Sequence, residues 1–254
     1  MSTLEVRSLR KSFGGLLATA DVSFAVPKHS LTALIGPNGA GKTTLFNLIT
    51  NLFPVDSGTV TFDGTELGGL SPSSIAKLGV IRTFQTARVF PGMTVLENVM
   101  AGRHRLLPHG LAAQLGWMPA ALRAERALAD RALALLDLVG LADQAQSPAT
   151  QLPMGAQKLL EVIRALMAQP RLLLLDEPAA GLNDTETAEL AALLRAIQAC
   201  GVTIVVVEHN MSLVMGIADQ IVVLEAGRMI AAGPPADIQR DPHVIAAYLG
   251  EDAA

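Results

Sequence analysis

The sequence predicts an α/β fold with a mainly parallel sheet at its core, an antiparallel β part at the N-terminus and an inserted helical subdomain. Two observations indicate the parallel core: short apolar runs recur along the chain, and segments of helical spacing lie between them. Continuous apolar runs are typical of parallel strands that are buried on both faces. They occupy residues 31–35, 172–175, 202–207 and 220–224. A third observation is a mostly helical stretch at about 93–168, which separates the first run from the others and predicts the insertion.

The N-terminal elements are predicted from a different pattern. Residues 4–9 and 22–26 alternate apolar and polar side chains, which predicts half-buried antiparallel strands. After the first apolar run and a glycine-rich loop, residues 43–52 have apolar side chains at helical spacing. Residues 58–62 then favour another strand, which an Asp63-Gly64 turn ends.

The remaining elements lie in the middle and the C-terminal half. Residues 119–139 predict an Ala-rich helix that Gly140 ends as a C-cap, after an irregular stretch at 103–118. We expect further helices at 185–199 and 211–218, and a turn at 225–227.

Composition limits the classes of protein. The 254 residues carry 19 basic and 23 acidic side chains, so the formal net charge is −4 and gives no electrostatic footprint for nucleic acid. Half of the residues are apolar, but the longest uncharged segment, 106–122, contains Pro108 and Pro119, so we expect no membrane-spanning helix. The N-terminal residues have no apolar segment of a secretory signal. We expect Cys200, which stands alone, to be a small buried side chain.

A glycine-rich loop with the spacing G-x-x-x-x-G-K-[ST] follows the first apolar run. Glycines let backbone N–H groups turn toward phosphate oxygens, and the N-terminus of the next helix adds a favourable dipole. In such a loop the lysine reaches the β- and γ-phosphates and the hydroxyl ligates Mg²⁺. The sequence therefore predicts a nucleotide-binding loop made of Gly36, Pro37, Asn38, Gly39, Ala40, Gly41, Lys42, Thr43 and Thr44.

Two carboxylates, Asp176 and Glu177, follow the apolar run at 172–175. The end of a buried strand places them at the C-terminal edge of the sheet, where α/β proteins bind ligands. We expect Asp176 to help hold Mg²⁺ and Glu177 to polarise the attacking water as a general base. Taken alone, the pair also fits solvated charges that end a strand.

Two weaker signals lie on other segments. His209 comes just after the strand at 202–207 and can reach the same sheet edge, although a lone histidine is more often structural. Gln85, in the segment Arg82-Thr-Phe-Gln, indicates nothing by itself.

In this order and separation, the four motifs resemble those of the ATP-binding cassette (ABC) ATPases, over essentially the whole chain. Leu152–Gln157 lies where that family has its signature loop, and Ala180–Asn183 lies where it has its D-loop. Phe13 is placed like the family's aromatic residue that stacks on adenine. The resemblance implies the P-loop NTPase fold of the ABC ATPases. It implies one domain at 1–254, with an α/β core at 1–92 and 169–254 and a helical subdomain at about 93–168.

A finer resemblance is to the ATPases of bacterial branched-chain (hydrophobic) amino-acid importers. It rests on residues 82–90, 93–99, 179–183, 208–215 and 247–251. Importers for urea or short amides share much of this pattern, so they stay open as an alternative.

The resemblance implies a mechanism of ATP hydrolysis that uses Mg²⁺. The metal ligands would be Thr43, Gln85 and Asp176, and the catalytic residues would be Lys42, Gln85, Glu177 and His209. Two cassettes would close head to tail, as a homodimer or a heterodimer. ATP would then lie between the phosphate loop of one chain and Gly155 in the signature loop of the other.

The resemblance also implies partners and a location. A membrane permease would be contacted through about Thr86–Val99, and a substrate-binding protein would take part indirectly; no nucleic acid is expected. The chain would be cytoplasmic and peripheral, on the inner membrane of a bacterium. We expect part of its apolar surface, near Val89, Phe90, Met93 and Val95, to be covered by the permease.

The signature loop departs from the family pattern. Pro153 replaces the usual serine, and Ala156 replaces the usual glutamine. Because Pro153 offers neither a hydroxyl nor an N–H, we expect this half of the composite site to be weakened. Gly155 and the N-terminus of the following helix keep their dipole contribution. Asn183 replaces the D-loop aspartate, as is normal for the subfamily.

Two other classes of function stay open. Soluble ABC ATPases of translation or DNA repair usually carry two cassettes or a long coiled-coil insertion, and neither is seen in this sequence. A non-hydrolysing regulatory module is disfavoured because the residues for catalysis are present. A small GTPase is disfavoured because no N-K-x-D motif occurs.

Overall fold

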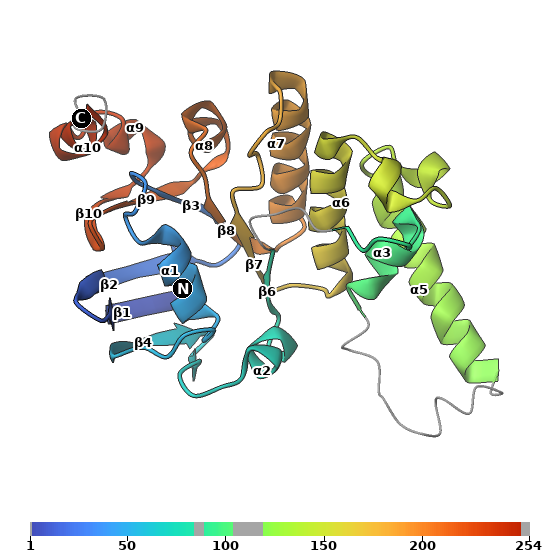
Figure 1. The fold of residues 1–254 in the computed structure, drawn as a ribbon, viewed down its shortest axis with the longest axis horizontal. Helices are drawn as coiled ribbons and strands as arrows, with labels where there is room; N and C mark the ends of the chain where they lie inside the picture. The colour runs from blue at the N-terminus through green and yellow to red at the C-terminus, as the bar shows by residue number, and fades with distance from the viewer. Residues whose placement is uncertain (1, 84–88, 104–118, 250–254) are drawn as a thin grey trace. The chain divides into compact units, whose positions relative to one another are not determined.

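The computed structural model describes residues 2–83, 89–103 and 119–249 (Figure 1). The chain forms two compact units. The first comprises residues 1–85, 171–180 and 187–254, and the second comprises residues 86–170 and 181–186.

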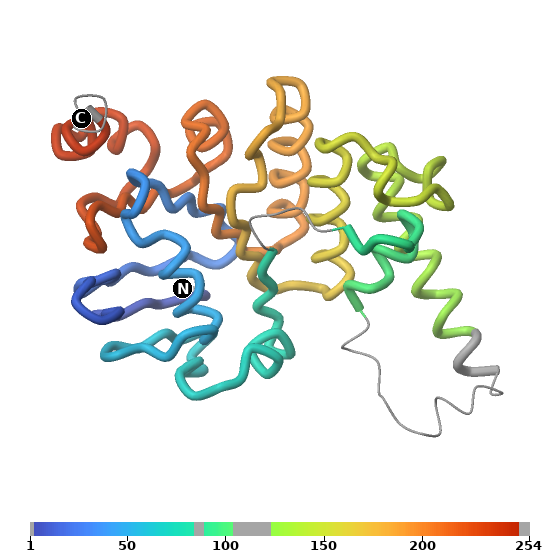
Figure 2. Tube along the Cα trace, in the orientation of Figure 1, coloured from blue at the N-terminus to red at the C-terminus, as the bar shows by residue number. Residues whose placement is uncertain are grey.

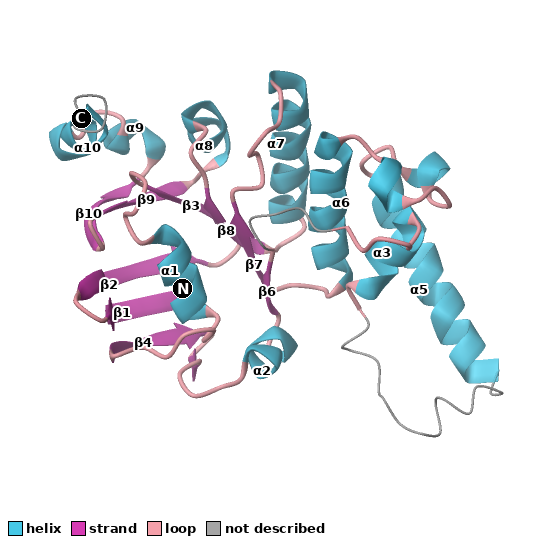
Figure 3. Cartoon of the chain, viewed as in Figure 1, coloured by secondary structure: helices cyan, strands magenta, loops and turns pink. Residues whose placement is uncertain are grey.

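A mainly parallel sheet forms the core of the first unit (Figure 3). Its strand order is β10-β9-β3-β8-β7-β6, and every neighbouring pair is parallel except β10 and β9. Three strands are buried along their whole length, as their continuous apolar sequences predict. The strands are β3 (Leu31–Ile35), β6 (Val80–Arg82), β7 (Leu172–Asp176), β8 (Thr203–Val207), β9 (Gln220–Glu225) and β10 (Arg228–Gly233). The predicted α/β fold with a parallel core is confirmed.

A second, antiparallel sheet has the order β2-β1-β4-β5. Its strands are β1 (Ser2–Phe13), β2 (Leu16–Pro27), β4 (Ser57–Phe62) and β5 (Thr65–Glu66). The alternating side chains behave as predicted, since Leu4, Val6 and Val22 are at most 1% exposed. Register shifts along β1 and β2 interrupt the regular alternation, so the strands extend beyond the alternating segments.

The first unit also contains short helices. Helix α1 (Lys42–Ile49) buries its apolar face in the core and ends earlier than predicted, because Asn51 adopts a left-handed backbone with φ 50°. The others are α2 (Pro72–Lys77), α8 (Met211–Ile217), α9 (Pro235–Ile238) and α10 (Pro242–Leu249); α7 (Asp184–Ala199) begins in the second unit and continues in the first. In Figure 2 the sheet joins segments from the blue and the red ends of the chain, because β3 pairs with both β8 and β9.

The described part of the second unit is helical, as predicted. It contains α3 (Val95–Ala101), α5 (Pro119–Asp137) and α6 (Met154–Met167), with 3₁₀ turns η2 (Ala142–Gln144) and η3 (Ala149–Gln151). Gly140 follows α5 with φ 67° and donates its N–H to the carbonyl of Asp137, as the predicted C-cap requires. Among the described residues, no helix is both long and apolar enough to cross a membrane.

One residue prediction is wrong at this level. Cys200 is exposed rather than buried. It lies just after α7, in the turn that Gly201 closes with φ 89°, and such a turn lies at the surface.

Candidate functional site

The phosphate loop joins β3 to α1, as predicted. Gly36, Gly39 and Gly41 all have positive φ, at 144°, 78° and 97°. A Cβ at Gly36 would overlap the carbonyl oxygen of Leu224, and one at Gly41 would lie 2.5 Å from the carbonyl oxygen of Ala18. Packing as well as backbone conformation therefore requires glycine at both ends of the loop, whereas Gly39 has open space around it.

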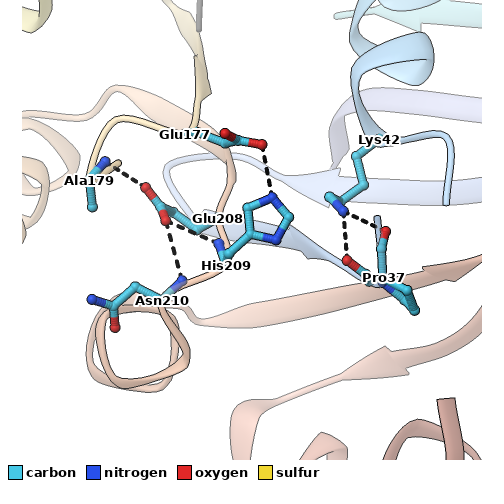
Figure 4. A network of polar contacts seen from close by, with 8 residues as sticks. Pro37, Lys42, Glu177, Ala179, Glu208, His209 and Asn210 are labelled. Carbon is cyan, nitrogen blue, oxygen red and sulfur yellow. Dashed lines mark hydrogen bonds and ion pairs between the residues drawn. The ribbon is translucent and has the colours of Figure 1, made fainter. Parts of the chain in front are cut away.

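Lys42 and Thr43 open helix α1. The Lys42 ammonium is buried in the loop and donates to the carbonyls of Gly36 at 2.6 Å and Pro37 at 2.8 Å (Figure 4). Thr43 is exposed, and this fully described helix has no acidic side chain in its first turn. The loop thus combines a positive charge with a helix N-terminus, a combination that binds anions such as phosphate.

Asp176 ends strand β7 and is 2% exposed. Its Oδ2 accepts a hydrogen bond from Arg82 Nη2 at 2.9 Å, while its Oδ1 is buried without a hydrogen-bond partner among the described residues. Burial raises the pKa of the Asp176 carboxyl, and the Arg82 guanidinium opposes that rise. An unpaired buried carboxylate oxygen suits a hard cation, so Asp176 fits the predicted role of Mg²⁺ ligand.

Glu177 and His209 meet at the ends of neighbouring strands β7 and β8. Glu177 Oε1 and His209 Nε2 are hydrogen-bonded at 2.8 Å, and Figure 4 shows the two side chains pointing toward each other. Glu177 has φ 52°, a conformation that costs a non-glycine residue about 1–2 kcal/mol. This left-handed turn gives the two consecutive carboxylates different partners, Arg82 for Asp176 and His209 for Glu177.

Glu208 is a site residue that the sequence did not reveal. It is 3% exposed and accepts backbone N–H bonds from Ala179 at 2.7 Å, His209 at 3.1 Å and Asn210 at 3.4 Å (Figure 4). Burial raises its pKa, and these N–H donors oppose the rise. Glu208 thereby ties the segment after Glu177 to the segment that carries His209. The available signal was a carboxylate between a buried strand and a histidine.

Phe13, at the end of β1, is the predicted adenine-stacking residue. The residue is 41% exposed, and its ring packs edge-on against Phe53 with the centroids 5.4 Å apart. The Lys11 ammonium lies 5.5 Å from the ring centroid. An exposed and supported ring of this kind can accept a flat partner.

The signature segment lies in the second unit. Pro153 is the N-cap of α6 and supplies no side-chain cap, as its lack of a hydroxyl predicts. A Cβ at Gly155 would overlap the Glu186 carboxylate, so a larger residue there would require that side chain to move. Asn183 and Glu186 cap the start of α7 reciprocally, at 3.0 Å and 2.9 Å. Asparagine therefore has a local structural role at the D-loop position.

The residues of the predicted permease surface differ in their exposure. Phe90 and Met93 are 44% and 40% exposed, and Val89 is half-buried. Val95 is completely buried, so its predicted place on this surface is wrong. The reason is local: Thr94 and Glu97 form a capping box that starts α3 at Val95 and turns it inward. Gln85 and residues 86–88 lie outside the described residues.

The parallel sheet brings four predicted residues to one edge. Lys42 follows β3, Asp176 ends β7 and Glu177 follows it, and His209 follows β8, which lies between β3 and β7. Pro153 and Gly155 belong to the second unit.

Comparisons with known proteins agree with this geometry. The profile of the ABC transporter family matches residues 19–180. A second profile, described as branched-chain amino acid ATP-binding cassette transporter, matches residues 228–254.

Relatives and solved structures are similar over nearly the whole chain. The high-affinity branched-chain amino acid transport ATP-binding proteins LivG of Salmonella typhimurium and BraF of Pseudomonas aeruginosa are each 45% identical, over 98% of this chain and 98% of their own length. An ATP-binding cassette of an ABC transporter, solved in its ADP conformation, is 31% identical with a TM-score of 0.86, covering 98% of this chain and 99% of its own. The predicted resemblance and the predicted fold are confirmed.

Proposed function

Because the chain belongs to the ABC transporter family, we propose that it is the ATP-hydrolysing subunit of an importer for branched-chain or other hydrophobic amino acids. The observation that carries the hydrolytic role is the contact of Glu177 with His209, at the sheet edge that also holds Lys42 and Asp176. The amino-acid substrate class is supported by the relatives and by the profile match at 228–254.

The phosphate loop binds the triphosphate of ATP. The Lys42 ammonium exchanges its two loop carbonyls for β- and γ-phosphate oxygens, and N–H groups at the start of α1 point at the same anion. The exposed Phe13 ring stacks on adenine. Together these contacts hold the γ-phosphate next to the carboxylates at the sheet edge.

Mg²⁺ accompanies the nucleotide. Thr43, Gln85 and Asp176 would hold it, and Asp176 Oδ1 is the ligand whose surroundings fit it directly. Bound there, the ion would neutralise the negative charge that develops on the phosphate oxygens.

Hydrolysis uses Glu177 as the general base. Its carboxylate takes a proton from water as the water oxygen bonds to the γ-phosphorus and the bond from that phosphorus to the bridging oxygen of ADP breaks. The hydrogen bond to His209 fixes the direction of the carboxylate. Lys42 stabilises the negative charge of the transition state.

The working assembly contains a second cassette and a permease. A partner chain supplies its signature loop to the ATP held here, and Gly155 of this chain does the same in return. The permease covers Phe90 and Met93 within Thr86–Val99, while the substrate-binding protein acts on the permease and does not touch this chain. This assembly would place the chain on the cytoplasmic face of a bacterial inner membrane.

The variant Glu177→Gln tests the hydrolytic role. We expect the steady-state ATPase rate to fall about a hundredfold or more, while ATP still binds, because only the base is lost. Glu66→Gln, on the exposed strand β5, is a matched control that leaves the rate unchanged. A Glu177→Gln variant that hydrolyses ATP at the parent rate would show that another group is the base.

Transport assays test the substrate class. The chain, assembled with its permease and binding protein, is expected to drive ATP-dependent uptake of labelled leucine into vesicles. Uptake of urea but not of leucine would replace the proposed substrate with the short-amide alternative. Co-purification with ribosomes or DNA instead of a permease would contradict a transport role.

A further inference from the structure

Arg82 joins three elements next to Asp176, a predicted metal ligand. It is the last residue of β6, and its side chain is 9% exposed. Nη2 donates to Asp176 Oδ2 on β7 at 2.9 Å, and Nη1 donates to Asn47 Oδ1 on α1 at 2.6 Å. The guanidinium also lies 5.5 Å from the ring centroid of Phe46. The strand that leads toward Gln85 is thus bonded both to the carboxylate strand and to the phosphate-loop helix.

The bond to Asp176 distinguishes the two carboxylate oxygens. Oδ2 is occupied by Arg82, whereas Oδ1 is buried without a hydrogen-bond partner among the described residues. A carboxylate held by one oxygen cannot rotate freely, so the direction of Oδ1 is fixed before any cation arrives. Arg82 therefore determines which oxygen of Asp176 is offered as a ligand.

The bond to Asn47 extends the same control to α1. Thr43 lies four residues before Asn47 and therefore one turn away along the helix. Through one guanidinium, the helix that carries Thr43 is fixed to the strand that carries Asp176. The planar guanidinium offers N–H groups on two separate nitrogens in a fixed fork that reaches both acceptors, whereas the donors of a lysine ammonium all sit on one nitrogen.

Resting on the proposed function, we propose that Arg82 is a positioning residue for Mg²⁺. It holds Asp176 and the helix of Thr43 in the arrangement that binds the ion, without touching ATP or the ion itself. Removing its fork should therefore weaken metal binding while leaving metal-free ATP binding intact.

The experiment measures the affinity of the protein–ATP complex for Mn²⁺ by electron paramagnetic resonance. The full chain carries Glu177→Gln so that ATP persists, and ATP alone gives the reference affinity. We expect Arg82→Met to weaken Mn²⁺ binding about tenfold or more, the usual effect of removing a group that orients a metal ligand. We expect the ATP affinity measured in excess EDTA to stay at the parent value.

Two further variants separate positioning from general damage. Asn47→Ala releases α1 but keeps the Arg82–Asp176 bond, so we expect a smaller loss of Mn²⁺ affinity. Arg82→Lys keeps the charge without the fork, so we expect it to lie between the parent and Arg82→Met. Circular dichroism confirms that each variant is folded; if Arg82→Met does not fold, Arg82→Lys and Asn47→Ala decide the question.

Three results would overturn the inference. They are unchanged Mn²⁺ affinity in the folded variants, an equal loss of metal-free ATP affinity, and a parent complex that holds Mn²⁺ no more tightly than ATP alone does. A parent chain that binds no ATP would instead contradict the proposed function, so the two failures are distinguishable.

Discussion

Individual residues at the sheet edge acquire different roles from their partners rather than from their type. Asp176 and Glu177 are consecutive carboxylates, but the first is buried against Arg82 and the second turns to His209. Glu208 is a third carboxylate, and within the part of the chain that the structure describes it accepts hydrogen bonds from backbone N–H groups only. These surroundings fit the proposed roles of Asp176 as a metal ligand and Glu177 as a base, and they let Glu208 hold two loop segments together.

Glu208 should make stability depend on pH. Because burial raises its folded-state pKa above the ordinary 4.5, the folded protein binds this proton more tightly than the unfolded chain does. The stability from this group is present below pH 4.5 and is lost as pH rises through the raised pKa. The Glu208→Gln variant has no titrating group at this position. As pH rises from 4.5 through the raised pKa, the free energy of unfolding of the parent should therefore fall relative to that of the variant. Urea unfolding at several pH values measures this, and parallel pH curves for the two proteins would contradict it.

Gly36 should tolerate no side chain. A Cβ there overlaps the Leu224 carbonyl, so we expect Gly36→Ala to lower the free energy of unfolding by about 2 kcal/mol or more and to abolish ATP binding. Gly64→Ala is the matched control, since Gly64 also has positive φ but open space around it, and it should cost only about 1 kcal/mol. Urea unfolding and ATP titration check both. Equal losses for the two variants would show that backbone strain, not the overlap, governs Gly36.

At the scale of elements, the turn before α3 holds two apolar side chains, Phe90 and Met93, at the surface. Asn98 is fully buried; it accepts from the Phe90 N–H at 2.7 Å and donates to the Thr94 carbonyl at 2.9 Å. The Arg164 guanidinium lies 5.0 Å from the Phe90 ring centroid. The turn is therefore held in shape from inside the second unit while Phe90 and Met93 face solvent.

The variant Phe90→Ser/Met93→Ser tests this element as the permease surface. We expect weaker binding to permease-containing membranes, because exposed apolar area that the partner would cover is lost. The ATPase rate of the isolated chain should not change. Leu138→Ser, which removes another strongly exposed apolar side chain from the same unit, is the matched control for co-sedimentation. Undiminished membrane binding by the double variant would show that the permease binds a different surface of this chain.

Elements with a strong repeating pattern could be predicted from the sequence, and those without one could not. The buried strands β3, β7 and β8 follow from continuous apolar runs. Strand β6 has only three residues, and β10 is half-exposed along its length, so neither has a readable period. The prediction that Val95 is exposed is wrong because the sequence around an exposed turn does not indicate whether an apolar residue next to it faces the core or the solvent.

At the scale of the whole molecule, site residues at strand ends could be predicted from the sequence, whereas contacts between residues far apart in the sequence could not. The phosphate loop, Asp176, Glu177 and His209 follow strands, so the sheet rule alone predicts that they share an edge. Arg82 bonds Asp176 from 94 positions away, and Glu208 bonds Ala179 from 29 positions away. No local pattern encodes such contacts, because they depend on strand order and side-chain direction.

The signature loop gives a prediction for the assembled transporter. Because Pro153 caps α6 without a hydroxyl or an N–H, the composite site that it completes should hydrolyse ATP slowly. We expect Pro153→Ser to raise the ATPase rate of the assembled transporter about tenfold or more, since one anion-binding hydrogen bond is worth about 1.5–3 kcal/mol. The same change should leave the stability of the isolated chain nearly unaltered. An unchanged ATPase rate in the assembled transporter would contradict the prediction that Pro153 weakens the composite ATP site.

The exposed position of Cys200 has a practical consequence. It is the only cysteine in the sequence, so a maleimide dye or a nitroxide would attach at one defined place without any engineering. Cys200 precedes β8 and His209 follows it, so the probe would lie at the end of this strand opposite to the proposed catalytic site. In the head-to-tail pair proposed above, two such labels would report opening and closing as a change in the distance between them.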